Sequence, residues 1–271
     1  MGRFSGQIAF VTGAARGQGR AHCVRLAEEG CDVIAVDICG PVETSKIAAA
    51  TPADLEETAR LVEKAGATIF ARQVDVRDLD AMEAAVTEGV SGFGGRLDIV
   101  VANAGIVTAG RTWELTEAQW RTMIDVNLTG VWNTMKAAVP HMLRAGNGGS
   151  IVMTSSIGGY RGLPHEAHYS AAKHGLVGLC KTLAFELGPD RIRVNTIHPN
   201  GVNTHMTTEP DLIPVLQSDP RAAAHVAGVL PDDMQMQEPS DVAATVAWLC
   251  SDEARYITGA QVPISGGNQL M

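Results

Sequence analysis

The sequence predicts an α/β protein with a doubly wound parallel sheet. Short apolar runs alternate with helical patterns along the whole chain. The runs are apolar on both faces, which is typical of strands buried between two layers of helices. A length of 271 residues fits one large domain better than two small ones. We therefore expect a single domain over residues 1–271, with a seven-stranded parallel sheet flanked by helices.

Seven runs of β-branched and other apolar residues predict the strands. They cover residues 8–12, 33–36, 69–74, 99–102, 151–154, 194–197 and 262–264. Helical patterns cover residues 20–29, 52–65, 79–90, 117–145, 169–187 and 240–250. Two segments fit neither pattern: an insertion at about 38–51, and a stretch at about 200–237 that we interpret as a substrate loop. Long irregular segments in a compact domain are usually functional or mobile.

The charge and the cysteines exclude several classes of protein. The net charge is −9 and no Lys/Arg run forms a stripe, so we do not expect a nucleic acid partner. No apolar run approaches the roughly 18 residues of a membrane span, and residues 1–13 lack the features of a signal peptide. The five cysteines form no CxxC pair and the histidines show no zinc-binding spacing, so we expect free thiols, no metal and a cytoplasmic location.

A glycine-rich turn follows the first predicted strand. Gly13 permits the tight turn, Gly17 lets the backbone approach a pyrophosphate, and Gly19 lets the following helix pack against the sheet. The helix N-terminus then offers free N–H groups to phosphate. We assign these glycines, with Arg16 and Gln18, to the dinucleotide site of a Rossmann fold, although an ordinary glycine-rich turn is the alternative.

The end of the second predicted strand indicates which dinucleotide binds. Asp37 stands eighteen residues after Gly19, where a carboxylate accepts both ribose hydroxyls of NAD and repels a 2′-phosphate. Arg16 favours the 2′-phosphorylated cofactor NADP instead, because a basic residue in the glycine-rich turn is able to face that phosphate. We weigh the carboxylate above one flexible arginine and expect NAD, with Ile38 also at the cofactor site.

Two further strand ends supply candidate cofactor contacts. Asp75 is placed to accept from the adenine amino group, with the N–H of Val76 alongside; a helix cap is the alternative. Asn103, Ala104 and Gly105 form a turn of small residues that lets the backbone lie against the cofactor.

Tyr169 and Lys173 are the candidate catalytic pair. A spacing of four residues puts both on one helix face. A phenol with a pKa of about 10 is a poor base at neutral pH, but an ammonium and an oxidised nicotinamide both favour the phenolate. Lys173 is also placed to hold the nicotinamide ribose. Ser156 ends the fifth strand and is expected to hold the substrate oxygen, and Asn127 is expected to fill a buried polar role.

Each of these four residues also has an ordinary structural interpretation: a solvated helix face for the pair, a strand end for the serine. Their conjunction at the carboxyl ends of strands in a dinucleotide fold favours catalysis.

The chain resembles the short-chain dehydrogenase/reductase family along nearly its whole length. The matching motifs are TGAARGQG at 12–19, Asp75-Val76, NAG at 103–105, Asn127, Ser156, YSAAK at 169–173 and HPNGVNT at 198–204. The resemblance implies a tetrad of Asn127, Ser156, Tyr169 and Lys173, and contacts of Val202 and Thr204 with the carboxamide and pyrophosphate. Asn200 departs from the glycine that the family often has there.

A narrower resemblance is to the actinobacterial subfamily that includes carveol dehydrogenase. The insertion at 38–51 and the sequences TSSIGGYRG and AHYSAAKHGLVGL are similar to it. The resemblance implies a secondary alcohol, cyclic or terpenoid, and a tightly held NAD that is re-oxidised through the carrier mycofactocin. A loop rooted just after Asp37 is able to fold over the adenosine half and slow its release. A surface insertion without such contacts is the alternative.

The substrate pocket is predicted from residues near the catalytic group. Candidates are Tyr160, Leu163, His165 and His168, followed by Met206, Ile213, Leu216, Met234 and Met236. An apolar, methionine-rich lining suits a hydrophobic alcohol or ketone without a fixed charge. The methionines and aliphatic residues are equally interpreted as loop anchors or interface residues. His165 and His205 are candidates for tuning the polarity of the pocket, with a solvated surface position as the alternative.

The resemblance also implies a homotetramer. Trp113, Trp120 and Trp132 offer apolar area for subunit contacts, or belong to the core. Two other functions share the fold. A non-catalytic NAD-binding regulator is opposed by the complete tetrad, and a carbonyl reductase for carrier-bound acyl chains is opposed by Asp37 and the net negative charge.

Overall fold

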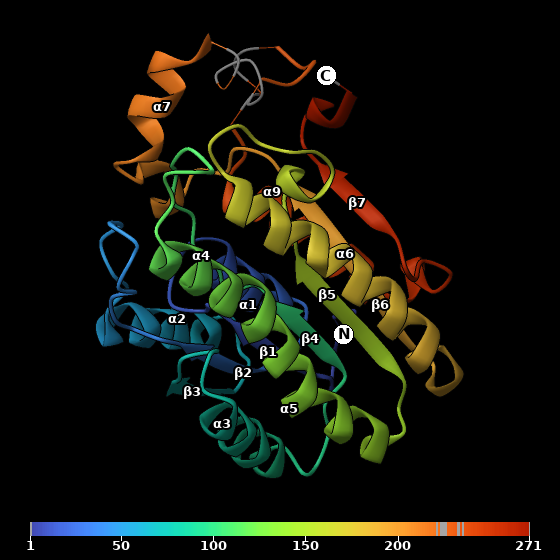
Figure 1. Ribbon diagram of the computed structural model, residues 1–271. Helices are drawn as coiled ribbons and strands as arrows, with labels where there is room; N and C mark the ends of the chain where they lie inside the picture. The colour runs from blue at the N-terminus through green and yellow to red at the C-terminus, as the bar shows by residue number, and fades with distance from the viewer. Residues whose placement is uncertain (1, 221, 223–226, 232–233, 235, 271) are drawn as a thin grey trace.

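Seven parallel strands form one sheet in the order β3-β2-β1-β4-β5-β6-β7 (Figure 1). The strands are β1 (Ile8–Thr12), β2 (Asp32–Asp37), β3 (Ile69–Gln73), β4 (Ile99–Ala102), β5 (Gly149–Thr154), β6 (Ile192–Pro199) and β7 (Gln261–Ile264). The computed structural model describes residues 2–220, 222, 227–231, 234 and 236–270, without the side chains of Ile213 and Leu216. The order of the strands reverses between β1 and β4, and ligands bind at such a switch point in open α/β sheets.

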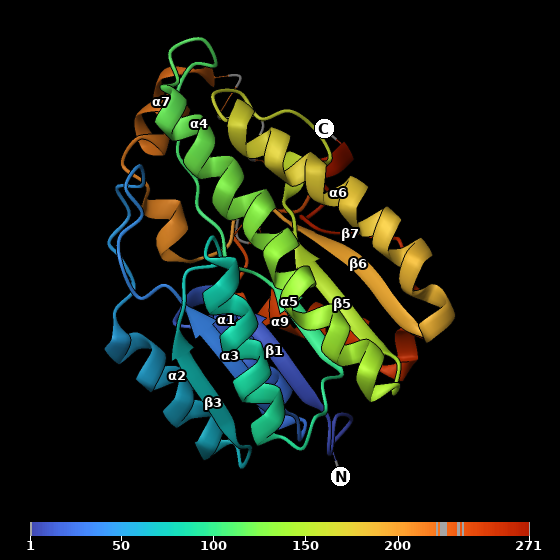
Figure 2. The same ribbon diagram turned by 60° about the horizontal axis from the view of Figure 1, so that its bottom comes forward.

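Helices cover both faces of the sheet, which confirms the doubly wound fold (Figures 1 and 2). The described helices of eight or more residues are α1 (Gly17–Glu28), α2 (Pro52–Lys64), α3 (Leu79–Gly92), α4 (Glu117–Ile124), α5 (Gly130–Ala145), α6 (Ala167–Leu187) and α9 (Pro239–Cys250). One apolar core lies between the sheet and α3, α5 and α6. A second core lies between the sheet and α1, α2 and α9. The sheet is therefore buried on both sides, as its apolar strands require.

The predicted helix at 117–145 is wrong in one respect. Helix α4 ends at Ile124, five residues Asp125–Thr129 form a π-helical turn, and α5 begins at Gly130. A π-helical turn widens the backbone ladder at one point, and such turns are frequent at functional sites. It contains Asn127, so the break lies at a residue of the predicted tetrad.

The two irregular segments differ from each other. Residues 38–51, between β2 and α2, contain no helix or strand. After β6, a 3-10 helix (His205–Thr208) and α7 (Leu212–Ser218) form where only irregular structure was expected. Both segments lie at the carboxyl-end edge of the sheet, close to the glycine-rich turn (Figure 2). No helix within the described ranges is long and apolar enough to cross a membrane.

Asn133 of α5 fixes the loop that leaves β3. Its amide donates to the carbonyl oxygens of Val76, at 2.8 Å, and Arg77, at 3.3 Å. The residue is 3% exposed, so these bonds form away from water. Through them, helix α5 sets the position of the Asp75-Val76 pair that the sequence assigns to the cofactor site.

We expect Asn133→Ala to lower the free energy of unfolding by about 1–3 kcal/mol, because two buried carbonyl oxygens lose their donor. Chemical denaturation monitored by circular dichroism measures the change. Arg144→Ala, at an exposed position of the same helix, is the control and should change stability by less than about 0.5 kcal/mol. Equal effects of the two substitutions would show that Asn133 does not support this loop.

Candidate active site

A cleft runs along the carboxyl ends of the central strands. The predicted site residues that line it are Gly13, Arg16, Gly17, Gln18, Asp37, Ile38, Asp75, Val76, Asn103, Ala104, Gly105, Ser156, Tyr169, Lys173, Val202 and Thr204. The topology thus brings together residues from nearly the whole length of the chain. Gly19 and Asn127, the remaining predicted site residues, do not line the cleft and act through their neighbours.

The glycine-rich turn is packed too closely for side chains. A Cβ atom on Gly13 would lie 2.8 Å from the Cα of Ala104, and one on Gly19 would lie 1.9 Å from the carbonyl oxygen of Gly13. Helix α1 begins at Gly17, and no side chain caps its first turn. The N–H groups of that turn are therefore available to an anion at the positive end of the helix dipole.

Asp37 is held from both sides at the end of β2. Its Oδ2 accepts a hydrogen bond from the N–H of Ala15 at 3.0 Å, and its Oδ1 accepts from the N–H of Cys39 at 2.9 Å. Each carboxylate oxygen keeps a lone pair for a further donor. The carboxylate is 8% exposed and lines the cleft, so it is fixed where it was expected to meet the ribose.

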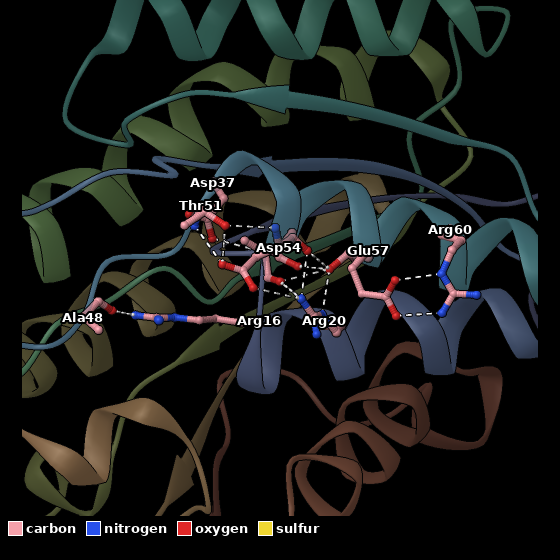
Figure 3. A network of polar contacts seen from close by, with 11 residues as sticks. Arg16, Arg20, Asp37, Ala48, Thr51, Asp54, Glu57 and Arg60 are labelled. Carbon is pink, nitrogen blue, oxygen red and sulfur yellow. Dashed lines mark hydrogen bonds and ion pairs between the residues drawn. The ribbon is translucent and has the colours of Figure 1, made fainter.

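Arg16 is turned toward the insertion and not left free for a phosphate (Figure 3). Its guanidinium donates to the carbonyl oxygen of Ala48 at 2.5 Å. The neighbouring Arg20 donates to the carbonyl oxygens of Ala15, at 2.5 Å, and Asp54, at 2.8 Å, where the insertion joins α2. In the sequence, Arg16 was the residue that favoured a 2′-phosphate over NAD. Its contact with Ala48 gives it a structural role instead.

The ends of β3 and β4 are fixed by different means. Asp75 already accepts from the guanidinium of Arg77 at 2.9 and 3.1 Å, so its expected bond to adenine needs its remaining lone pairs. At the end of β4, the N–H groups of Asn103 and Ala104 donate to the hydroxyl of Thr12 at 3.0 and 3.1 Å. These bonds bring the Asn103–Gly105 turn against the glycine-rich turn across the sheet.

Tyr169 and Lys173 are both buried in α6 and face the cleft. The Nζ atom of Lys173 lies 5.5 Å from the centre of the Tyr169 ring and donates to the carbonyl oxygen of Thr154 at 2.8 Å. Ser156 is hydrogen-bonded to Tyr169, and its Oγ accepts from the N–H of Gly158 at 3.1 Å. The hydroxyls of Ser156 and Tyr169 and the ammonium of Lys173 therefore converge on one place.

Burial dominates the electrostatics of this group. It raises the pKa of Tyr169 above its usual value, while the hydrogen bond from Ser156 acts in the opposite direction. Burial lowers the pKa of Lys173 to about 7. The protein alone thus disfavours the phenolate, which we expected from the sequence with both the ammonium and an oxidised nicotinamide present. Ionising Tyr169 near neutral pH requires a further positive charge in the cleft.

Asn127 fixes the backbone beside the cleft. Its Oδ1 accepts from the N–H of Ile106 at 3.1 Å, and its amide donates to the carbonyl oxygen of Ile106 at 3.0 Å. A Cβ on Gly105 would lie 2.7 Å from that Oδ1. The π-helical turn therefore places Asn127 where it fixes the chain after the Asn103–Gly105 turn, and the expected buried polar role is confirmed.

The predicted pocket residues between Ser156 and the catalytic tyrosine do not line the cleft. Tyr160 donates to the carbonyl oxygen of Gln261, His168 bonds to Thr108, and His165 contacts Asp219. Leu163 packs against the core. Their side chains turn to structural partners, so their closeness in sequence to Ser156 was misleading.

Of the methionines and aliphatic residues predicted for the substrate pocket in the segment after β6, Met206 lines the cleft. Met234 and Met236 are 55% and 53% exposed. The side chains of Ile213 and Leu216 lie outside the described part of the chain. His205, which the sequence analysis also considered for the pocket, lines the cleft as well. Lining residues that the sequence analysis missed include Ile106, Val126 and Thr207, with Gly40, Val42, Ser45, Ile47, Ala49 and Ala50 of the insertion. Ile106 and Val126 are next to the predicted site residues Gly105 and Asn127 in the sequence, but no local pattern marks the individual insertion residues.

The insertion is tied to the segment after β6 across the mouth of the cleft. The hydroxyl of Ser45 donates to Oε2 of Glu209 at 3.2 Å, and the ammonium of Lys46 lies 2.7 Å from Oδ1 of Asp211. Glu209 is 0% exposed. We call these two contacts the clasp. The insertion is also held at its base, where Glu43 accepts from Arg77 at 2.8 Å.

Comparison with known proteins places this geometry in context. A family model described as enoyl-(acyl carrier protein) reductase matches residues 13–269. A (−)-trans-carveol dehydrogenase of Rhodococcus erythropolis is 46% identical, with each chain covered over its full length. A crystal structure of carveol dehydrogenase from Mycobacterium avium in complex with NAD aligns over all of both chains, with a TM-score of 0.95 and 47% identity. A short chain dehydrogenase from Mycobacterium paratuberculosis bound to NAD aligns as fully, with a TM-score of 0.96 and 44% identity.

The buried ammonium generates a prediction about pH. Because burial lowers the pKa of Lys173 from 10.5 to about 7, the unfolded chain binds more protons than the folded chain between these values. Stability from this group therefore rises with pH through that window. We expect the ligand-free wild type to gain stability relative to Lys173→Met between about pH 7 and pH 9, measured by thermal unfolding.

Lys181→Met, at an exposed position of the same helix, is the matched control and should show no such trend. A difference between wild type and Lys173→Met that stays constant with pH would contradict the low pKa of Lys173.

Proposed function

The chain belongs to the short-chain dehydrogenase/reductase family, and from this premise we propose that it interconverts a secondary alcohol and its ketone with Tyr169 as the proton carrier. It is an NAD-dependent alcohol dehydrogenase, as its relatives and the cleft agree. The observation that carries the proposal is the buried group of Tyr169, Lys173 and Ser156, which opens into the same cleft as the glycine-rich turn.

The residues of the cleft fit NAD. The uncapped first turn of α1 suits the pyrophosphate, and Asp37 suits the ribose hydroxyls on the adenine side. The buried Oε1 of Gln18 has no partner among the described residues, so an acceptor remains for a donor on the nucleotide. We assign the nicotinamide end to Lys173, Val202 and Thr204. When bound, NAD supplies the acceptor for the hydride and a positive ring beside Tyr169.

Side chains of the protein bind the substrate oxygen and transfer its proton. The hydroxyls of Ser156 and Tyr169 bind the substrate oxygen between them, so the carbinol carbon is held in one orientation. During oxidation Tyr169, as phenolate, takes the hydroxyl proton, and in the reverse direction it returns a proton to the carbonyl oxygen. Lys173 stabilises the phenolate by its charge, and Asn127 keeps the chain below the site in place.

We propose a cyclic or terpenoid alcohol, carveol-like, as the substrate. Ile106, Val126 and Met206 give the cleft an apolar wall beside the catalytic group, which suits a hydrophobic ring without a charge. The two carveol dehydrogenases among its relatives support the same class. A reductase for carrier-bound acyl chains remains the second candidate, because the matching family model carries that description. Asp37 and a net charge of −9 oppose it, since they disfavour NADPH and an acidic carrier.

We further propose that NAD stays bound between turnovers. The clasp joins the insertion to the segment after β6, and residues on both sides of it line the cleft. NAD that does not leave must be re-oxidised in place, so a second redox carrier, such as mycofactocin, has to approach the cleft. The exposed Trp120 and Trp132 on α4 and α5 support a homotetramer rather than the core role that the sequence left open.

Tyr169→Phe tests the central assignment. Removing one hydroxyl deletes the proton carrier without changing the shape of the cleft, so we expect kcat to fall at least about 100-fold while NAD affinity is kept. Steady-state assays with carveol and an artificial electron acceptor, together with calorimetric titration of NAD, measure both. Tyr256→Phe, at a position 87% exposed, is the control. Near-normal turnover of Tyr169→Phe would exclude the proposed mechanism.

The clasp gives a second test. Ser45→Ala with Lys46→Ala removes both contacts, and we expect NAD to dissociate at least about tenfold faster. The loss comes mainly from the bond to the buried Glu209, since a hydrogen bond to a buried charged group contributes about 1.5–3 kcal/mol, whereas the exposed pair of Lys46 and Asp211 contributes little. Stopped-flow displacement of NADH by excess NAD measures the rate. Lys64→Ala, at an exposed position outside the clasp, should leave it unchanged. If the wild type already exchanges NAD as fast as the double variant, the clasp does not retain the cofactor.

A further inference from the structure

His198 is a buried histidine that the tetrad does not include. It lies near the end of β6 and is 0% exposed. Its Nδ1 is 2.7 Å from the carbonyl oxygen of Ser156, and its Nε2 is 2.8 Å from the hydroxyl oxygen of Thr196. One imidazole therefore connects β6 directly to the backbone of the serine that binds the substrate oxygen.

The protonation state of His198 follows from its partners. A carbonyl oxygen only accepts, so Nδ1 must carry the hydrogen. Burial lowers the pKa of His198 to about 4; the hydrogen bond to the Ser156 carbonyl acts in the opposite direction, and the nearby Lys173 and His174 lower it further. The ring is therefore neutral near pH 7. Its Nε2 accepts the single hydrogen of the Thr196 hydroxyl at 2.8 Å, in preference to the carbonyl oxygen of Ala260, which lies 3.3 Å from that hydroxyl. This pattern holds one tautomer and one ring orientation.

Packing leaves the ring little freedom. The ring of Tyr160 meets that of His198 edge to face, with centroids 4.4 Å apart and an interplanar angle of 64°. The hydroxyl of Tyr160 is anchored in turn on the carbonyl oxygen of Gln261 in β7, at 2.7 Å. A Cβ on Gly159 would lie 2.9 Å from the carbonyl oxygen of Lys173 and 3.2 Å from the Cε1 atom of His198, and closer still to the hydroxyl of Ser155, so the chain passes tightly between α6 and the imidazole.

Ser156 is consequently held at both its carbonyl and its hydroxyl. The carbonyl oxygen accepts from Nδ1 of His198 and from the N–H of Gly159 at 2.9 Å. The Oγ atom accepts from the N–H of Gly158 at 3.1 Å, which leaves the hydroxyl hydrogen free to point at another acceptor. With its backbone fixed in this way, the serine hydroxyl is set toward Tyr169.

We propose that His198 is a positioning residue for the reaction: its imidazole holds the Ser156 carbonyl and thereby fixes the serine hydroxyl against Tyr169 and the substrate oxygen. This inference rests on the proposed role of Ser156. It adds a residue that touches neither substrate nor cofactor but sets the geometry of one that does. A small displacement of such a group costs rate, because catalysis depends on placement within about 1 Å.

A double-mutant cycle with Ser156→Ala tests the inference. His198→Phe keeps a buried ring without the donor, and we expect kcat to fall about 10- to 100-fold with NAD affinity unchanged. In the Ser156→Ala background the same substitution should have no further effect, because the serine hydroxyl it positions is gone. His198→Asn places an amide N–H near the position of Nδ1, and should restore most of the kcat.

Thr196→Val is a second route to the same test. It removes the donor to Nε2 while His198 remains, so it should lower kcat only when Ser156 is present. Losses that multiply in the two backgrounds, or His198→Asn as slow as His198→Phe, would overturn the inference. If Ser156→Ala lowers kcat but neither His198→Phe nor Thr196→Val does, the positioning role of His198 is overturned and the proposed role of Ser156 stands. If Ser156→Ala is fully active, the proposed role of Ser156 and the positioning role of His198 are both overturned.

Discussion

The geometry of the candidate active site depends on the burial of a phenol, Tyr169, and an ammonium, Lys173, one helical turn apart on α6. A charged ammonium is costly inside a protein unless polar groups receive it, and here the carbonyl oxygen of Thr154 at the end of β5 does so. Its neighbour Tyr169 is hydrogen-bonded to Ser156, two residues further along the same strand end. The position of α6 against β5 is therefore set by polar contacts that also form the reactive group. Burial raises the pKa of Tyr169 and lowers that of Lys173, so the phenolate needs a further positive charge, which we propose that bound NAD supplies.

Around this pair, buried polar side chains hold the backbone segments that follow the strands in place. Asn127 holds the chain after β4, Asn133 holds the chain after β3, and Asp37 holds the segments that follow β1 and β2. Each of these polar side chains is buried and bonded to backbone. The cleft is thus preformed, which reduces the ordering that ligand binding must impose. The clasp is different, because it joins two segments without long secondary structure, both of which contribute residues to the cleft lining.

Much of the fold follows from the sequence because its signals are local. Strands buried on two faces produce apolar runs, and the glycine-rich turn requires small residues at Gly13 and Gly19, so both were predicted with nearly the observed bounds. The π-helical turn at Asn127 was not predicted, since the pattern of apolar residues continues through it and the shift in hydrogen bonding depends on the chain at Ile106. Likewise, the sequence predicts Tyr160 and His168 at the substrate pocket, but their side chains bond to Gln261 and Thr108, partners that are distant in the sequence.

The most direct measurement of the central claim is an ultraviolet titration of Tyr169. The difference spectrum between wild type and a variant lacking this phenol isolates its ionisation from that of Tyr160 and Tyr256. The account predicts that saturating NAD shifts this ionisation to a lower pH than in the ligand-free protein, and that replacing Lys173 by Met reverses much of the shift. An ionisation of Tyr169 at the same pH with and without NAD would contradict the account.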